Sequence, residues 1–281
     1  MEQRAGRRES AGTRALDEVF DCLRNIVYQK SGIALGDNKR ALLFARAGKR
    51  MRALGLSDMP EYVRYLLEDT SGNEVVKLID AVSINVTSFF REPDHFAVLS
   101  EVITRGLKQG FRKFRFWSAA CSTGEEPYSM AIQILETAKG ARLDVKILAT
   151  DISTQALAKA RAGTYGEEAL KPVPPALRQL YFDRVGGDQE CCYAVKPAVR
   201  DLVLFKRLNL TSVPFPMRGP MDVIFCRNVM IYFDGLTRMK VLGEMERLLV
   251  PGGYLMVGHA ESLIGFTGKF RFVRPSVYMR Q

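Results

Sequence analysis

The stretch Phe114-Arg-Phe-Trp-Ser-Ala-Ala-Cys-Ser-Thr-Gly-Glu-Glu-Pro-Tyr-Ser-Met-Ala-Ile132 decides the fold. It begins as a short apolar strand, continues as a loop of small residues from Ser118 to Gly124, and ends as a helix rich in Ala, Ile and Met. The Glu-Glu-Pro at 125–127 suits a helix start, because acids complement the N-terminal dipole and proline fits the first turn. Small loop residues let a ligand approach the backbone closely. The stretch therefore predicts a nucleotide site between a strand and a helix.

A second strand, Val145-Lys-Ile-Leu-Ala-Thr150, follows this helix and ends in Asp151. An acid at that tip of a βαβ unit is the usual partner of ribose hydroxyls. The loop lacks both the three glycines of a dinucleotide fingerprint and the Gly-Lys-Ser/Thr of a phosphate-binding loop. Glu125 and Glu126 would repel a pyrophosphate, but they suit a cofactor with a sugar, an amine and a sulfonium. Each glutamate alone is equally well explained as a helix cap, whereas the whole series is not.

The composition is that of an ordinary globular protein, with 47% apolar and 26% charged residues in a chain of 281. That length allows one large domain or two modest ones. No apolar run is as long as a membrane span and no signal-peptide pattern is present, which predicts a cytoplasmic protein. The formal net charge of +10 predicts an acidic partner, whether nucleic acid, an anionic membrane surface or an acidic protein.

The cysteines and histidines form no metal-binding pattern. The chain has only two histidines, His95 and His259, and no spacing among them and the five cysteines matches a metal site. The sequence therefore predicts no metal, and it predicts free thiols in a reducing compartment. The cysteines are Cys22, Cys121, Cys191, Cys192 and Cys226. The adjacent pair at 191–192 has no functional interpretation.

The first part of the chain is predicted to be helical. Residues 1–14 lack an apolar period and are expected to form a disordered basic tail, followed by an all-helical domain over residues 15–84. The segment from Lys39 to Arg52 contains six basic residues and no acid. Such a basic stripe is either a solvated helix face or a docking surface. The first helix has apolar residues at three- and four-residue steps, namely Leu16, Val19, Phe20, Leu23 and Val27.

A linker over residues 85–95 leads into a domain over 96–281 in which strands and helices alternate. This pattern indicates an α/β fold with a parallel sheet covered on both faces. The alternation breaks between Leu180 and Leu202, where a turn at 185–189 precedes Cys191-Cys-Tyr-Ala-Val195 and indicates an inserted hairpin. Strands of the main sheet are predicted at 114–118, 145–150, 202–206, 221–226, 253–258 and 272–279.

In an open α/β sheet, ligands bind beyond the carboxyl ends of the strands. Four segments are predicted to meet there, namely 119–126, Asp151-Ile152, Asn209-Leu210 and Cys226-Arg-Asn-Val-Met-Ile-Tyr-Phe-Asp234. The polar residues of the last segment are typical of a substrate-facing loop, although a helix-capping turn would also explain them. The linker Val82-Ser-Ile-Asn-Val-Thr-Ser-Phe-Phe-Arg-Glu92 interleaves polar and apolar residues, which suits either a cover over the cofactor or an ordinary packed linker.

Several motifs together closely resemble the chemotaxis receptor methyltransferases, the CheR family. They are Ile84-Asn-Val-Thr-Ser-Phe-Phe-Arg91, Ser118-Ala-Ala-Cys-Ser-Thr-Gly-Glu-Glu-Pro-Tyr-Ser129, Ala149-Thr-Asp-Ile-Ser153, Phe225-Cys-Arg-Asn-Val-Met-Ile-Tyr-Phe-Asp234, Leu249-Val-Pro-Gly-Gly-Tyr-Leu255 and Gly258-His-Ala-Glu-Ser262. The resemblance implies a helical N-terminal domain and a seven-stranded class I (Rossmann-like) methyltransferase sheet. It also implies a small β-subdomain, inserted here at about 181–206.

The resemblance further implies a protein-glutamate O-methyltransferase. S-adenosyl-L-methionine would donate the methyl group, S-adenosyl-L-homocysteine would be the product, and receptor glutamate side chains would become methyl esters in sensory adaptation. Arg91 and Tyr232 would face the methyl-transfer centre. The implied cofactor contacts are Asn85, Thr87, Arg91, Glu126, Asp151, Asn209, Leu210, Cys226, Arg227 and Asn228.

The implied partner is the cytoplasmic helical domain of methyl-accepting chemotaxis receptors, at which the enzyme would be recruited to membrane receptor arrays. The basic helix from Lys39 to Arg52 is a candidate docking surface, and the β-subdomain binds a C-terminal receptor peptide in some members.

The acceptor carboxylate is ionised at neutral pH, with a reference pKa of about 4.3, so that no general base is required.

Two other functions stay open at this stage. The basic charge favours an RNA or DNA methyltransferase, but the chain has no recognisable RNA-binding module and no Asp/Asn-Pro-Pro-Tyr/Phe loop after the strand at 221–226. These two absences argue against a nucleic-acid partner, and none is expected. The other alternative is a non-catalytic regulator that only senses the cofactor, and the intact polar loops argue against it.

Overall fold

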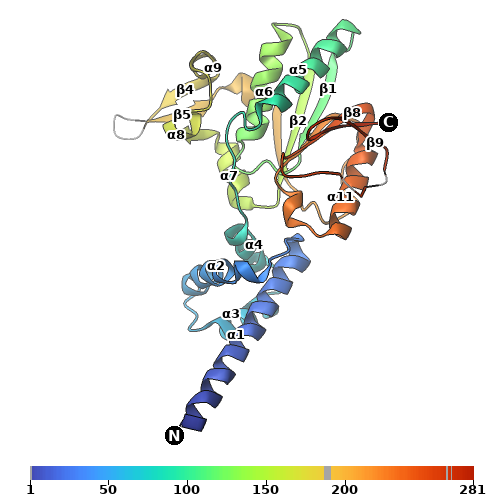
Figure 1. Cartoon of the computed structure of the whole chain (residues 1–281). Coiled ribbons are helices and arrows are strands. Elements are labelled where there is room, and N and C mark those ends of the chain that lie inside the picture. Colours follow the sequence, from blue (N-terminus) through green and yellow to red (C-terminus); the bar gives the residue numbers. More distant parts are fainter. Residues whose placement is uncertain (1, 187–190, 264, 267) are drawn as a thin grey trace. The chain divides into compact units, whose positions relative to one another are not determined.

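The computed structural model describes residues 2–186, 191–263, 265–266 and 268–281, with side chains from Leu16 onward (Figure 1). The chain forms two compact units. One contains Met1–Ile84 together with Tyr232–Asp234, and the other contains Asn85–Ile231 and Gly235–Gln281. No helix among the described residues is long and apolar enough to cross a membrane.

The first unit is built from helices, as the sequence predicts. They are α1 (Glu2–Ser31), the short 3-10 helix η1 (Asp37–Lys39), α2 (Arg40–Ala53), α3 (Met59–Glu68) and α4 (Asn73–Val82). Asp58 begins α3 by accepting a hydrogen bond from the amide of Glu61 at 2.8 Å. The helix pattern buries one face of each helix in a common core, which includes Phe20, Leu23, Val27, Leu43, Tyr62 and Leu78.

The N-terminal tail differs from the expectation. Helix α1 begins at Glu2, whereas the sequence predicts a disordered tail over residues 1–14. Because this segment has no apolar period, a helix formed there has no apolar face to bury. Its residues still have intrinsic helix propensity. The segment is rich in Glu, Arg, Gln and Ala, which favour helix, and it continues a helix already formed from residue 16 onward.

A half-buried ion pair joins α2 to α4 inside this unit. Arg50 donates from Nε and Nη2 to the two carboxylate oxygens of Glu74, at 2.8 and 2.9 Å. The hydroxyl of Tyr62 donates to the same carboxylate at 3.2 Å, and burial together with Glu74 raises the pKa of Tyr62. The Glu74 side chain is only 2% exposed, so its charge depends on these partners.

We predict that Arg50→Met destabilises the protein by about 2–3 kcal/mol, because it leaves the buried Glu74 carboxylate with only the more distant ammonium of Lys77, at 3.8 Å, as a cation. The control is Lys171→Met, which removes an exposed ion pair with Glu168 and should cost less than about 1 kcal/mol. Urea unfolding followed by circular dichroism measures both values. Equal losses in the two variants would contradict the assigned role of Arg50.

The second unit contains a seven-stranded sheet with the order β6-β2-β1-β7-β8-β10-β9. The first five of these strands pair in parallel, and β10 pairs antiparallel with both β8 and β9. The predicted Rossmann-like methyltransferase sheet is thereby confirmed. The strands are β1 (Lys113–Ser118), β2 (Asp144–Asp151), β6 (Val203–Arg207), β7 (Met221–Cys226), β8 (Leu249–Val257), β9 (Phe270–Arg274) and β10 (Val277–Arg280).

One predicted strand of this sheet is in fact two. The sequence predicts a single strand over 272–279, but β9 ends at Arg274 and β10 begins at Val277. Ser276 lies between them in the left-handed region, with a φ of 59°, and the two strands pair antiparallel. The helices of this unit are α5 (Pro93–Lys108), α6 (Glu125–Ala138), α7 (Thr154–Ala162), α8 (Glu167–Leu170), α9 (Pro175–Tyr181), α10 (Pro197–Arg200) and α11 (Gly235–Leu248), with the 3-10 turn η2 at Met230–Tyr232.

The inserted β-subdomain is a three-stranded antiparallel sheet of order β3-β5-β4. It consists of β3 (Thr164–Gly166), β4 (Phe182–Val185) and β5 (Cys192–Val195). The predicted bounds of 181–206 are wrong at both ends, because β3 precedes them and β6 belongs to the main sheet. The predicted hairpin is confirmed by the pairing of β4 with β5, while residues 187–190 lie outside the described part.

Tyr165 of β3 fixes the subdomain to the core of the unit. Its ring packs edge-on against Phe89 at a centroid distance of 5.0 Å, and Phe182 of β4 packs against the same phenylalanine at 5.5 Å. The Tyr165 hydroxyl donates to the carbonyl of Thr123 at 2.7 Å. The subdomain therefore supports the loop that follows β1.

Candidate active site

The loops after β1, β2 and β7 meet at the carboxyl edge of the main sheet, because these three strands are parallel neighbours. Backbone hydrogen bonds hold the loop after β1 against the other two strands. The amide of Ala119 donates to the carbonyl of Phe225 at 2.8 Å, and the amide of Cys121 donates to that of Thr150 at 2.9 Å. The first, second and fourth segments that the sequence places at the strand ends are thus brought together.

Gly124 ends the loop after β1, and its conformation allows no side chain. Its φ is +99°, and an added Cβ would lie 2.8 Å from the Tyr165 hydroxyl and 2.9 Å from Cβ of Ala160. In the same loop, the amide of Ser122 donates to Oδ2 of Asp151 at 2.8 Å. The amide of Ser153 donates to Oδ1 at 2.9 Å, so the Asp151 carboxylate is held in one orientation at the tip of β2.

The two glutamates at the start of α6 have different surroundings. Glu125 accepts a hydrogen bond from the Thr123 hydroxyl at 2.6 Å, which ties it to its own loop as a helix cap would be. Glu126 is buried, and the Ser118 hydroxyl donates a hydrogen bond to its Oε1 at 2.6 Å. Burial raises the pKa of Glu126, and the guanidinium of Arg227 opposes that rise.

Arg227 is the central charged group of the site. Its side chain is 2% exposed and pairs with Glu92 at 2.9 Å and with Glu126 at 3.3 Å. Nη2 also donates to the carbonyl of Arg91. The guanidinium lies 5.5 Å from the ring centroid of Phe225, within cation–π range. One arginine thus links the end of β7, the start of α6 and the segment before α5.

The backbone around this arginine is strained. Phe90, Glu92 and Asn228 all have positive φ values, of 53°, 56° and 57°. Each such residue costs on the order of 1–3 kcal/mol and persists only where its surroundings hold it in place. Strained residues of this kind cluster at functional sites, and here they flank the Arg227 side chain.

The linker segment lies on the loop after β1. Its backbone is fixed by the Ser122 hydroxyl, which donates to the carbonyl of Asn85 at 3.1 Å, and by the amide of Phe90, which donates to the Ser129 hydroxyl at 2.9 Å. Arg91 reaches back to the carbonyl of Val86 at 3.1 Å, and Thr87 is half-buried between them. Asn85, Thr87 and Arg91 thus belong to a segment anchored at the strand ends.

The structure also contains a supporting residue that the sequence reasoning missed. The carboxylate of Glu261 accepts hydrogen bonds from five backbone amides: those of Asn228, Val229, Met230, Ile231 and Gly258, at 2.8, 3.0, 2.7, 3.3 and 2.6 Å. Four of these donors are consecutive and carry the turn after Arg227. The motif Gly258-His-Ala-Glu-Ser262 contained the signal, but no spacing in the sequence links it to residue 228.

The chain matches two family models. "CheR methyltransferase, SAM binding domain" covers residues 85–279, and "CheR methyltransferase, all-alpha domain" covers residues 18–83. The chain belongs to the CheR family. It is 39% identical over 262 residues to the "Chemotaxis protein methyltransferase" of Escherichia coli (strain K12), covering 93% of this chain and 90% of the relative. It is also 39% identical over 261 residues to "Chemotaxis protein methyltransferase 2" of Pseudomonas aeruginosa, with 93% and 92% covered.

As a CheR-family methyltransferase, the chain depends on S-adenosylmethionine, and the donor set fits that cofactor. The carboxylates of Asp151 and Glu126 are acceptors of the kind that hydroxyl groups and an ammonium or sulfonium would require, and both are fixed near the strand ends by hydrogen bonds. The described site contains no cluster of free cations for a phosphate, since Arg227 is shared between two glutamates. The site therefore suits a nucleoside cofactor without phosphates.

The remaining predicted site residues take three kinds of position. Cys226 is buried at the end of β7, and burial raises the pKa of its thiol. Asn209 follows β6 and accepts from Thr211 within its own turn at 3.0 Å, while the next residue, Leu210, is buried. Tyr232 belongs to the first unit, where its carbonyl accepts from the amide of Ala34 at 2.9 Å.

We predict that Glu261→Ala frees the turn over residues 228–231, because its amides lose their common acceptor. Amide hydrogen exchange at these residues should accelerate at least tenfold, and the melting temperature should fall by several degrees. The control is Glu101→Ala, which removes an exposed pair with Arg274 and should leave exchange in the turn unchanged. Unchanged exchange in Glu261→Ala would contradict the supporting role.

Proposed function

We propose that this methyltransferase transfers the methyl group of S-adenosylmethionine to glutamate side chains of methyl-accepting chemotaxis receptors, forming glutamate methyl esters. The observation that carries the proposal is the buried Arg227, held between Glu92 and Glu126 at the strand ends of a CheR-family domain. The relatives are named chemotaxis protein methyltransferases. That the methyl acceptor is a receptor glutamate is our inference.

The residues assigned to the cofactor have distinct tasks in this proposal. Asp151 binds the ribose hydroxyls, because its carboxylate is already oriented by two amides. Glu126 and Arg91 contact the methionine part, and Asn85, Thr87, Asn209, Leu210, Cys226, Arg227 and Asn228 complete the pocket. When bound, S-adenosylmethionine supplies an electrophilic methyl group on a sulfonium. No metal is required for this chemistry.

The acceptor carboxylate needs orientation and dry surroundings more than a base. A glutamate has a reference pKa of about 4.3 and is ionised at neutral pH. Positioning of two reactants contributes about 7–11 kcal/mol in favourable cases. We assign the aiming of the acceptor to Arg91 and Tyr232.

We propose that helix α2 docks on an acidic part of the receptor. Lys39, directly before the helix, and Arg46, Lys49 and Arg52 within it are exposed. Arg50 and Arg40 are instead engaged with Glu74 and Asp17. The four exposed cations supply a positive surface that attracts an acidic helix at long range. This interaction would recruit the enzyme to receptor arrays at the membrane.

The β-subdomain offers a second contact. In the described residues, β3 and β4 each pair only with β5, so that both are outer strands. An extended receptor peptide would add to one of these edges by backbone hydrogen bonding.

The proposed reaction is tested with radiolabelled S-adenosylmethionine, a receptor cytoplasmic fragment and, separately, total RNA. The proposal predicts label on the receptor that mild alkali releases. A methyl ester hydrolyses under these conditions, whereas the methyl group of a methylated nucleobase does not. Base-stable label on RNA would contradict it in favour of a nucleic-acid methyltransferase. Cofactor binding without transfer to either would favour a non-catalytic sensor.

Arg91→Ala and Tyr232→Phe are each predicted to lower kcat about 10- to 100-fold, with less than about threefold change in the Kd of S-adenosylmethionine. The reason is that misplacement of a reactant affects the reaction rate more than ground-state binding. Single-turnover kinetics and calorimetry measure the two quantities. Equal losses in rate and affinity would contradict the aiming role.

The double variant Arg46→Glu/Lys49→Glu is predicted to lower kcat/KM for the receptor about tenfold at low salt, with kcat unchanged. The difference from wild type should shrink at high salt, because screening weakens the attraction between exposed charges. The matched control, Lys108→Glu/Lys171→Glu, changes the net charge equally in the other unit. A salt-independent rate, or an equal loss in the control, would contradict docking by α2.

A further inference from the structure

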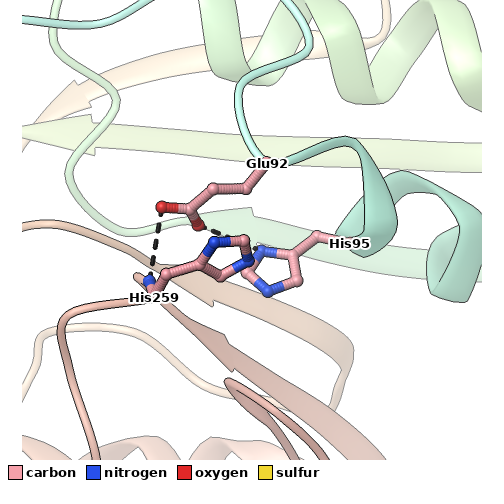
Figure 2. A group of neighbouring side chains, drawn as sticks. All are labelled: Glu92, His95 and His259. Carbon is pink, nitrogen blue, oxygen red and sulfur yellow. Dashed lines mark hydrogen bonds and ion pairs between the residues drawn. The ribbon is translucent and has the colours of Figure 1, made fainter.

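Two histidines far apart in the sequence face the same carboxylate. Figure 2 shows Glu92, His95 and His259 around a common point, and one ligand atom of each lies within 4.8 Å of the others. Glu92 and His95 flank the start of α5, and His259 follows β8. The rings of the histidines are nearly perpendicular, at 83°, with centroids 5.4 Å apart.

His95 is buried without a hydrogen bond. Its side chain is 0% exposed, and neither ring nitrogen has a hydrogen-bond partner among the described residues. Nδ1 lies 3.5 Å from Oε2 of Glu92, which is too long for a good hydrogen bond. A buried polar group of this kind costs free energy unless a partner satisfies it.

His259 has a carboxylate partner of the kind that commonly orients a metal-binding histidine. Its Nε2 lies 3.3 Å from Oδ2 of Asp94, and a carboxylate in this position orients an imidazole for a metal on the other nitrogen. The His259 side chain is 52% exposed. An ion can therefore enter from solvent, which the burial of His95 alone would not allow.

Glu92 retains the capacity to bind a cation beside Arg227. Oε2 is held by Arg227 at 2.9 Å, but the partners of Oε1 are distant, at 3.3 Å for the amide of His259 and 3.5 Å for Nδ2 of Asn228. Arg227 divides its charge between Glu92 and Glu126, and Asp94 adds a further carboxylate beside His259, so that the cluster attracts a cation.

We propose that Glu92, His95 and His259 form a binding site for a divalent transition metal, with Zn²⁺ as the best match. Two imidazoles, one carboxylate and a water are a common zinc ligand set. Metal bonds of about 2.0–2.2 Å require the three side chains to move closer together. This site goes beyond methyl transfer. The sequence predicted no metal, because residues 95 and 259 are too far apart in the chain to form a recognisable ligand spacing.

Calorimetric titration of ZnCl₂ into the full-length protein, with any purification tag removed, tests the site. One ion is predicted to bind with a micromolar or lower Kd. His259→Ala, a change at an exposed side chain, should raise the Kd at least tenfold. Asp94→Asn should raise it by a smaller factor, because it removes only the orienting partner. His95→Gln should likewise raise the Kd at least tenfold, because it removes another ligand.

The control is Cys191→Ser/Cys192→Ser, which removes the adjacent thiols and should leave the Kd unchanged. A Co²⁺-loaded protein should show a tetrahedral absorption spectrum that His259→Ala loses. Absence of binding in the wild type would overturn the proposal, as would binding that survives His259→Ala or disappears in the cysteine variant. His95 would then serve only as an aromatic ring packed against Phe225. Because neither cofactor nor receptor is present, the result is independent of the proposed methyl transfer.

Discussion

The guanidinium of Arg227 is the group on which the site depends. A charge buried to this extent is tolerated only when it is paired and hydrogen-bonded, and this one has Glu92, Glu126 and the Arg91 carbonyl as partners. These partners come from two separate segments of the chain, and Arg227 itself belongs to a third. Pairing the charge therefore fixes the start of α6, the end of β7 and the segment before α5 relative to one another within the same unit.

The strained backbone of the site follows from this requirement. Glu92 and Asn228 adopt positive φ values, which place their neighbours around the guanidinium. Glu261 offsets the cost on one side, because its carboxylate satisfies the consecutive amides after residue 227. In this site, Glu92 and Glu126 share the Arg227 cation, and the backbone amides after residue 227 share the Glu261 carboxylate. Asp151, at the end of β2, is oriented separately by the amides of Ser122 and Ser153.

Much of the fold could be predicted from the sequence, because its signals are local. The strand, loop and helix over 114–132 appear in the structure as β1, the Gly124 turn and α6. The subdomain boundary was wrong because β3 has only three residues and no period can be recognised over that length. The strand predicted over 272–279 concealed a reversal at Ser276, since serine seldom adopts a positive φ.

The site was predicted less completely, because its partners are distant in the sequence. Arg227 and Asp151 were proposed from their places after strands, and the structure positions both at the strand ends; their roles stay predictions. Glu261 was missed, since its donors lie about thirty residues earlier and are backbone amides that no side-chain pattern reveals. The cluster of Glu92, His95 and His259 was missed for the same reason. Only the packing of β8 beside β7 brings these residues to the strand ends.

The most direct test of this account is the affinity of S-adenosylhomocysteine for Arg227→Met, measured by calorimetry at a temperature where circular dichroism shows a folded protein. Arg105→Met is the matched control, because Arg105 is bonded to Tyr254 and not to the site glutamates. The account predicts that the Kd rises at least tenfold in Arg227→Met and less than twofold in the control. A Kd unchanged in Arg227→Met would show that the cofactor pocket forms without this arginine, and would contradict the account.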